Sequence, residues 1–337
     1  MPNGAVKGPV RARERFVSYG HPGEPSRQPP VNVPSLMRPQ GCVPRECVPR
    51  GCVPQGCFPG GILPARANRV TTLGMNEAIA SLVRRHDPDR FLTALFAPPA
   101  WRDALLTLYA FNHELARARE VASEPPLALI RLQWWREVVE GEPKRHEVAS
   151  PLYEAIAAGG LRPVDLLPII EAREAEAYAD FETLADWRAW LLAGAGGVAV
   201  AAGAALGAPE PEALRPFGAA YGVAGLLRAT GVLAAQGTCL LPRDLLARHG
   251  LSPEAFLDDP GSASARAAQH DIVREGQTLL LAAAETQVPR IALAAALPAV
   301  LSRRDLARWP TIEMPRGLGD RLAVIFAGMS GRILPRA

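Results

Sequence analysis

Apolar side chains recur at intervals of three and four residues through most of the chain after Met75. Leu105, Leu108 and Leu115 form one such series, and this spacing places them on one face of an α-helix. The alternation of apolar and polar residues that is typical of strands is not apparent in the sequence. We therefore predict that residues 75–337 form one all-α domain. Its further helices are expected at residues 163–178, 187–206, 212–235, 243–249, 265–286 and 289–303.

Another helix is expected to begin near Pro125, because a proline in the first turn of a helix loses no hydrogen bond. By the same helical spacing, its buried face would be formed by Leu127, Ile130, Trp134 and Val138. On this interpretation Trp134 is a core residue. Its replacement by alanine should lower the free energy of unfolding by about 3–5 kcal/mol, the usual loss for a buried large aromatic side chain.

Residues 1–74 show no such period and are rich in Pro, Gly and Arg. A segment of this composition cannot bury enough apolar surface to fold, so we predict a disordered tail that is dispensable for folding. The alternative is that this segment is not translated and that the chain starts at Met75. Structural zinc sites favour shorter gaps than the five-residue period of the tail's cysteines, so we predict no metal site there. These cysteines are Cys42, Cys47, Cys52 and Cys57.

Charge is distributed unevenly along the chain. Residues 1–74 carry ten basic and three acidic side chains, whereas the remaining residues carry 27 basic and 31 acidic ones. A mildly acidic body argues against nucleic-acid binding, because a nucleic-acid-binding surface needs a positive field. No apolar segment of the secretory type occurs in residues 1–20, so we expect a cytoplasmic protein.

The longest stretch without a charged residue runs from residue 189 to residue 209. Its length would suit a membrane span, but it consists mostly of Ala and Gly, which gain little on transfer into lipid. We interpret it as a core helix whose small residues permit close contact with its neighbours. A peripheral contact at the inner face of the membrane is the most that we expect.

Three groups of residues are of types that form cofactor or metal sites, but they lack the neighbouring structure or the spacing that such sites require. Residues 194–199 imitate a dinucleotide-binding glycine loop, yet such a loop must follow a strand. The six histidines show no metal-ligand spacing on a helix. Glu171, Glu174 and Glu176 could hold a metal, but Arg173 lies among them, and we interpret the group as a solvated helix face with internal salt links.

Three blocks of sequence resemble the squalene/phytoene synthase family, an all-α isoprenoid synthase fold with a central cavity. The blocks are residues 109–136, 193–207 and 221–245, with Tyr109-Ala110-Phe111 in the first and Leu241-Pro242 in the third. Residues 110–116, 129–135 and 228–230 are more similar to a degenerate branch of that family, the synthase-like assembly factors of mitochondrial complex I. The resemblance implies the fold for most of residues 86–305.

The resemblance also implies where the chemistry of the synthases would lie. Synthases of this family hold Mg²⁺ between two helices that carry aspartate-rich motifs, and Mg²⁺ requires several oxygen ligands. At the corresponding positions this chain has Ala116, Arg117 and Glu120 in the first motif, and Leu233 and Gln236 in the second. We therefore assign no catalytic residue, no metal site and no cofactor; Mg²⁺ enters only if the chain is an enzyme.

Three functional hypotheses follow from this pattern. The first is a non-catalytic protein that aids the assembly of respiratory complex I (NADH:ubiquinone oxidoreductase), with complex I subunits or assembly intermediates as partners. The second is an active prenyl transferase that makes squalene- or phytoene-type products. The third is a carrier that binds a prenyl lipid in the cavity. We further predict that Arg117, Arg119 and Arg228 lie near the mouth of the cavity, where they would favour an anion or an acidic partner segment.

Overall fold

The structure is a computed structural model that describes residues 76–120, 122, 124–178, 180–311 and 316–334. Contacts divide the chain into two units, residues 1–67 and residues 68–337. The predictions for residues 1–74, including the cysteine repeat, lie outside the described residues.

The described residues form helices throughout and contain no strand, which confirms the predicted all-α class. The helices are α1 (Glu77–His86), α2 (Pro88–Ala94), α3 (Pro99–Glu120), α4 (Pro125–Val139), α5 (Ala149–Ala157), α6 (Pro163–Tyr178), α7 (Leu184–Ala193), α8 (Ala195–Ala205), α9 (Arg215–Ala235), α10 (Arg243–Arg248), α11 (Pro253–Asp258), α12 (Ala263–Ala284), α13 (Leu293–Ala296), α14 (Pro298–Arg308) and α15 (Leu318–Ser330). Short 3-10 helices occupy Pro211–Leu214 and Arg290–Ala292.

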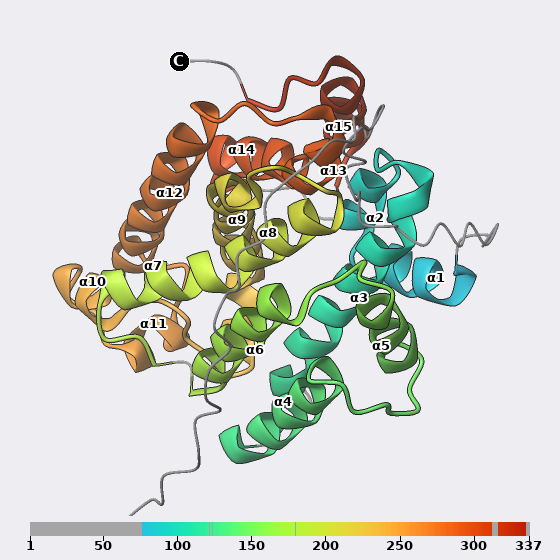
Figure 1. Cartoon of the computed structure of the whole chain (residues 1–337). Helices are drawn as coiled ribbons and strands as arrows, with labels where there is room; N and C mark the ends of the chain where they lie inside the picture. Colours follow the sequence, from blue (N-terminus) through green and yellow to red (C-terminus); the bar gives the residue numbers. More distant parts are fainter. Residues whose placement is uncertain (1–75, 121, 123, 179, 312–315, 335–337) are drawn as a thin grey trace, which may run out of the picture. The chain divides into compact units, whose positions relative to one another are not determined.

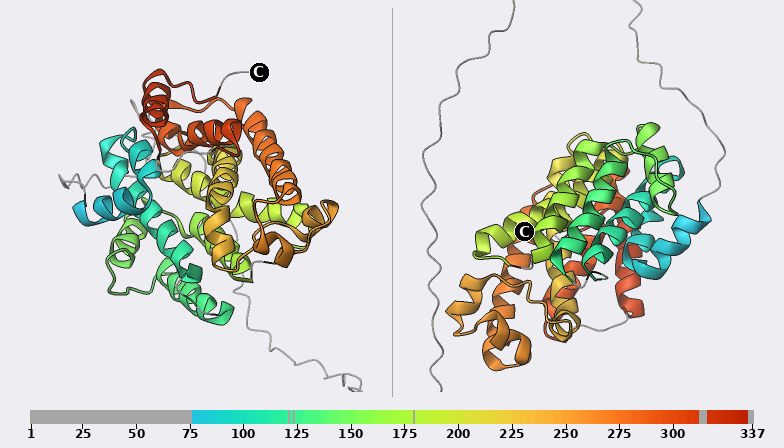
Figure 2. Two further views of the ribbon diagram at one scale, coloured as in Figure 1. Left: turned by 180° about the vertical axis from the view of Figure 1, so that it is seen from behind. Right: turned by 90° about the horizontal axis from the view of Figure 1, so that it is seen from below.

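Helices α8 and α9 lie side by side at the centre of the body (Figures 1 and 2). The green and teal helices α3 to α6 pack together on one side of this pair, and the orange and red helices α12 and α14 pack on the other side. Most of α8 is buried. The predicted core position of this small-residue helix is therefore confirmed.

Small side chains set the distance between α8 and α9. A Cβ atom at Gly218 of α9 would lie 2.3 Å from the carbonyl oxygen of Ala195, and one at Gly222 would lie 2.6 Å from the Ala195 Cβ atom. Neither separation is sterically allowed, so only glycine permits this approach. By length and composition Leu184–Ala205 and Pro211–Ala235 could cross a membrane, but 61% and 44% of their respective 18-residue apolar windows are buried inside the body, and the larger share is that of a core helix.

Two predicted helices are interrupted. The helix expected at residues 187–206 is two helices, α7 and α8, because the chain leaves helical geometry at Gly194, where ψ is −86°. The helix expected at residues 289–303 is likewise divided, into a 3-10 helix, α13 and α14, and α14 begins at Pro298, which has no N–H group to continue a preceding helix. Helix α6, in contrast, has the predicted bounds.

The predicted buried face of α4 is only partly correct. Leu127 and Ile130 are exposed and Trp134 is only partly buried, whereas the next residue, Trp135, is buried. Because α4 packs against α3, α5 and α6, those neighbours select the stripe that faces inward. The buried residues of α4 are Ala128, Leu132, Trp135, Val138 and Val139, so the prediction is confirmed for Val138. We therefore expect the large loss of stability for Trp135→Ala and not for Trp134→Ala.

Candidate functional site

The two motif positions lie at the carboxyl-terminal ends of α3 and α9. Ala116 is partly buried and Glu120 is exposed in the last turns of α3, while Leu233 is partly buried and Gln236 caps the end of α9. Between them these four side chains offer one carboxylate and one amide. No group of three or more His, Cys, Asp or Glu side chains within the described ranges could hold a metal ion. The residues present therefore do not fit the Mg²⁺ site of a synthase.

The arginines near the first motif have a local structural role. Arg117 and Arg119 stand in the last turn of α3, where helix carbonyl groups carry partial negative charge and a cation is stabilising. The Arg117 guanidinium also donates to the Glu114 carboxylate over 3.2 Å, one turn earlier. Arg117 is still half-exposed. Its charge therefore remains accessible to another molecule.

A groove of about 400 Å³ opens beside Arg117, between α3 and α4. Its walls are Glu114, Arg117, Ala118, Ile130, Arg131, Trp134, Trp135 and His146. The rings of Trp134 and Trp135 meet edge to face, with centroids 4.9 Å apart, and His146 lies edge-on against both. We call this the α3–α4 groove. It combines an aromatic floor with two arginines on its rim.

Arg228 does not join Arg117. It lies two turns before the end of α9, where its Nη1 atom is 3.3 Å from Asp89 of α2 and 3.9 Å from Asp305 of α14. It lines a different cavity of about 280 Å³, bounded also by Trp309 and Gln269. Arg117 and Arg228 therefore line different cavities, contrary to the prediction of a shared mouth, and the carboxylates of Asp89 and Asp305 hold Arg228.

The glutamate group on α6 serves helix packing. Arg136 of α4 donates to Glu174 over 2.8 Å and lies 3.8 Å from Glu171, which links α4 to α6. Arg173 donates to Glu176 over 2.6 Å, but Glu176 is buried rather than solvated. The predicted salt links are therefore present, but the face is not fully solvated, because Glu176 lies inside the body.

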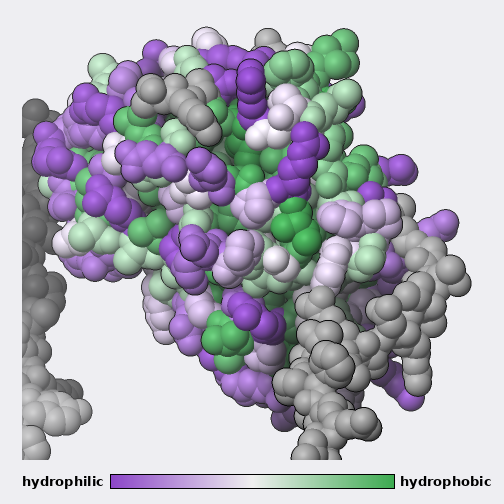
Figure 3. Space-filling view, turned by 45° about the horizontal axis from the view of Figure 1, so that its top comes forward, coloured by the Kyte–Doolittle hydropathy of each residue, from purple (hydrophilic) through white to green (hydrophobic). Residues whose placement is uncertain are grey.

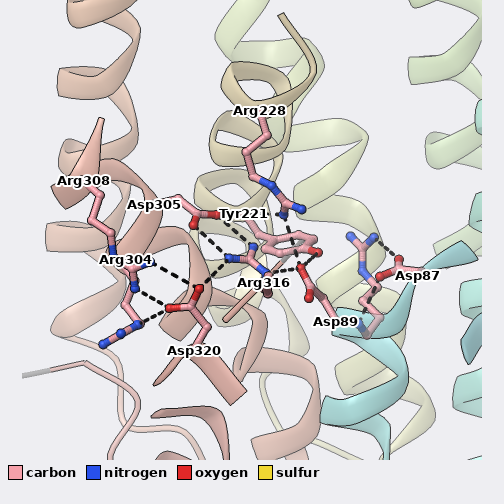
Figure 4. A network of polar contacts seen from close by, with 10 residues as sticks. Asp87, Asp89, Tyr221, Arg228, Arg304, Asp305, Arg308, Arg316 and Asp320 are labelled. Atoms are coloured by element: carbon pink, nitrogen blue, oxygen red, sulfur yellow. Dashed lines mark hydrogen bonds and ion pairs between the residues drawn. The ribbon is translucent and has the colours of Figure 1, made fainter. Parts of the chain in front are cut away.

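Arg228 belongs to a network of buried ionic groups that sequence inspection does not reveal (Figure 4). Its centre is Arg316, whose guanidinium donates to both oxygens of Asp305 at 2.8 Å and to Asp89 at 2.6 Å. Tyr221 also donates to Asp89, over 3.1 Å. Because Asp89 is 227 residues away from Arg316, no local sequence signal could have paired them.

The same network anchors α15. Asp320, in the first turn of that helix, accepts hydrogen bonds from Arg304, over 2.5 Å, and from Arg308. Burial alone would raise the pKa of Asp320, but the hydrogen bonds from Arg308 and Arg304 outweigh burial and place this pKa below its ordinary value. The ionised carboxylate is therefore the form that holds α15 on α14.

The lowered pKa of Asp320 predicts a loss of stability in acid. The carboxylate binds a proton more weakly in the folded chain than in the unfolded chain, so its contribution is complete above the ordinary aspartate pKa of about 4 and is lost as the pH falls below it. We expect denaturant unfolding between neutral pH and about pH 3 to show this decline. Asp320→Asn should be less stable than the wild type at neutral pH, and its free energy of unfolding should decline less as the pH falls. Parallel declines of the two proteins with pH would contradict the role given to the Asp320 carboxylate.

Comparisons with known proteins agree with this architecture. Residues 83–311 match the sequence profile of the family described as squalene/phytoene synthase. Among solved structures, a dehydrosqualene synthase in complex with ligand aligns with a TM-score of 0.62 at 14% identity, over 76% of this chain and 95% of that one. The squalene synthase HpnC from Alicyclobacillus acidocaldarius aligns with a TM-score of 0.58 at 21% identity, over 68% of this chain and 91% of that one.

Proteins named for the assembly of complex I are also similar to this chain. The human protein named NADH dehydrogenase (ubiquinone) complex I, assembly factor 6 is 27% identical over 281 residues, which are 81% of this chain and 78% of the human protein. Its rat counterpart is 28% identical over 202 residues, which span 58% of this chain and 61% of the rat protein. With two thirds of its length matched by the family profile and with the fold of the solved synthases, this chain belongs to the squalene/phytoene synthase family.

Proposed function

We propose that this chain is a non-catalytic member of its family that aids the assembly of respiratory complex I. The observation that carries the proposal is the loss of carboxylates at both motif positions, where Ala116 and Leu233 offer no oxygen ligand, in a chain similar to proteins named as complex I assembly factors. The proposal includes a cytoplasmic location. An assembly factor has no need of the metal site, so the motif positions are free to change while the fold is kept.

The α3–α4 groove is the surface that we propose for the partner. Its aromatic floor suits apolar side chains, and Arg117 and Arg131 on its rim suit an acidic segment of a complex I subunit or assembly intermediate. Ile130, on the same groove, is largely exposed. Ile130 and Trp134 line the groove together with Trp135, and this joint apolar surface supports protein binding at this position.

The proposal predicts that the purified full chain does not convert farnesyl or geranylgeranyl diphosphate in the presence of Mg²⁺. The physical reason is that Glu120 alone cannot hold the ions that assist ionisation of the diphosphate. The measurement is product analysis against a boiled-protein control. Squalene, phytoene or a presqualene-type intermediate above that control would favour the prenyl transferase hypothesis. A prenyl lipid extracted unchanged from the purified protein would favour the carrier hypothesis.

The role in assembly is tested by deleting the gene in the source organism and measuring complex I activity and assembled complex. We expect both to fall and to be restored by the wild-type gene. The double variant Arg117→Glu with Arg131→Glu should fail to restore them, whereas Arg266→Glu, a reversal at an exposed arginine on α12, should restore them. Unchanged complex I in the deletion strain would reject the proposed role. Full restoration by the double variant would reject only the groove.

A further inference from the structure

Helix α15 exposes an apolar face that its position in the fold does not explain. Five of its side chains are between 37% and 72% exposed: Leu318, Leu322, Ile325, Phe326 and Met329. Their spacing of four, three, one and three residues places all five on one side of the helix. Green, hydrophobic surface appears at the upper right of Figure 3, on the side where α15 lies in Figure 1. We call these five residues the α15 stripe.

The opposite side of α15 is firmly attached to the body. Val324 and Ala327 are buried, and Gly328 lies against the ring of Phe96, so closely that a Cβ atom there would be 2.3 Å from the ring. Asp320 adds the ion pairs with Arg304 and Arg308. Rotation of the helix would break these contacts. The α15 stripe is therefore held facing away from the body and is not a loosely packed part of the core.

The exposed charges on α15 and directly after its end have one sign. Helix α15 contains two charged residues, and the acidic one, Asp320, is turned inward and is only 2% exposed. The other, Arg321, is exposed at the edge of the stripe. A second exposed arginine, Arg332, follows directly after Gly331 caps the helix. The outward surface of α15 is therefore apolar with a basic margin.

We propose that the α15 stripe is a membrane-docking surface that binds an anionic lipid bilayer, with α15 lying in the plane of the interface. A helix of 13 residues is about 20 Å long, too short for a hydrocarbon core of about 30 Å, so α15 cannot span the membrane. An amphipathic helix with Leu and Phe on its apolar face and arginine beside it has the composition of an interfacial helix.

Charge selects the bilayer over a second copy of this chain. In a symmetric dimer through the stripe, both copies would present the same arginines, so Arg321 and Arg332 would find no exposed carboxylate on the facing copy of α15, because Asp320 is buried. Anionic lipid headgroups supply the complementary charge, and each arginine near such a surface strengthens binding about fivefold. The inference assigns a surface to the peripheral membrane contact that the sequence allowed for a cytoplasmic protein, and it does not depend on the role in complex I assembly.

The test is flotation of the purified full chain with vesicles of phosphatidylcholine containing about one third phosphatidylglycerol, and with vesicles of phosphatidylcholine alone. We expect the wild type to float with the anionic vesicles. Phe326→Ser with Met329→Ser should weaken that binding at least about tenfold, because two apolar side chains no longer enter the interface. Arg321→Gln with Arg332→Gln should weaken binding to the anionic vesicles alone by a comparable factor.

The matched control is Val164→Ser with Leu281→Ser. These residues are 68% and 64% exposed on α6 and α12, so the control removes similar apolar surface elsewhere, and we expect it to bind like the wild type. The basic residues 1–74 are present in every variant, so differences between variants report on α15 alone. Thermal unfolding of each variant verifies that the fold is kept.

A direct readout is the fluorescence of Phe326→Trp. The wild-type emission spectrum is subtracted from that of the variant, so that the remaining signal comes from the added tryptophan. This signal should shift to shorter wavelength on anionic vesicles for Phe326→Trp, whereas that of Val164→Trp should not shift. Equal flotation of the stripe variant and the control, or an unshifted Phe326→Trp spectrum, would overturn the proposal. A third outcome would replace the bilayer by a second copy of this chain as the occupant of the stripe. In that outcome the wild type is a dimer that does not bind vesicles, and Phe326→Ser with Met329→Ser converts it to a monomer. Vesicle binding and complex I assembly are measured separately, so failure of one is distinguishable from failure of the other.

Discussion

Trp187→Ala is expected to lower the free energy of unfolding by about 3–5 kcal/mol, the range for removing a large buried aromatic side chain. Trp187 of α7 is 0% exposed. Its indole N–H donates to the carbonyl oxygen of Leu240 over 2.9 Å, which joins α7 to the segment between α9 and α10. The substitution would leave both a cavity and a buried carbonyl without this donor. Denaturant unfolding followed by circular dichroism measures the loss.

Two comparisons separate these effects. Trp187→Phe keeps most of the apolar volume but removes the N–H donor, so its loss should be intermediate. Trp134→Ala, at a partly buried tryptophan on the α3–α4 groove, should cost clearly less than Trp187→Ala. A loss below about 1 kcal/mol for Trp187→Ala would show that this contact between α7 and the rest of the body is not required.

Asp305→Ala should destabilise the fold by a similar amount, about 3–5 kcal/mol, because it removes one member of a buried ionic network. The Asp305 side chain is 1% exposed and accepts two hydrogen bonds from Arg316, itself almost fully buried. Without this carboxylate, Arg316 would keep Asp89 at 2.6 Å and Asp320 at 3.8 Å, and Arg228 would lose one of the anions near it. Removal of an anion from beside a buried and a partly buried cation is unfavourable.

The control for this network is Asp180→Ala. Asp180 pairs with Arg243 at 2.6 Å, so the bond is short, but both side chains are about half exposed. Solvent screens such a pair, and we expect a much smaller change in stability than for Asp305→Ala. Thermal and denaturant unfolding of both variants give the comparison. Equal effects of the two variants would mean that burial does not determine the strength of this network.

Local sequence patterns predicted the helical elements well wherever the local signal was strong. Helix α6 begins at Pro163, a residue suited to a first turn, and ends as predicted at Tyr178. The Ala- and Gly-rich segment was predicted to be a core helix, and α8 is one. The break at Gly194 was missed, because glycine is compatible both with a continuous helix and with a helix end.

The inward face of α4 shows the limit of periodicity. Apolar residues occur on both the Leu127–Ile130–Trp134 face and the neighbouring face that includes Trp135, so spacing alone allowed either to be buried. Packing against α3, α5 and α6 selected the second. The first face was left exposed, and Ile130 and Trp134 became part of the α3–α4 groove.

By itself, the sequence determined the all-α class, the family resemblance and the presence of Ala116 and Leu233 where the resemblance led us to look for carboxylates, because these depend on which residues are present and on their spacing along one helix. Only the tertiary structure decided the environment of Arg228, which is paired with Asp89 and Asp305 and lines a cavity that Arg117 does not line. It also decided that α15 faces outward with its apolar stripe. Both outcomes depend on contacts between segments far apart in the chain, and such contacts leave no periodic signal in the sequence.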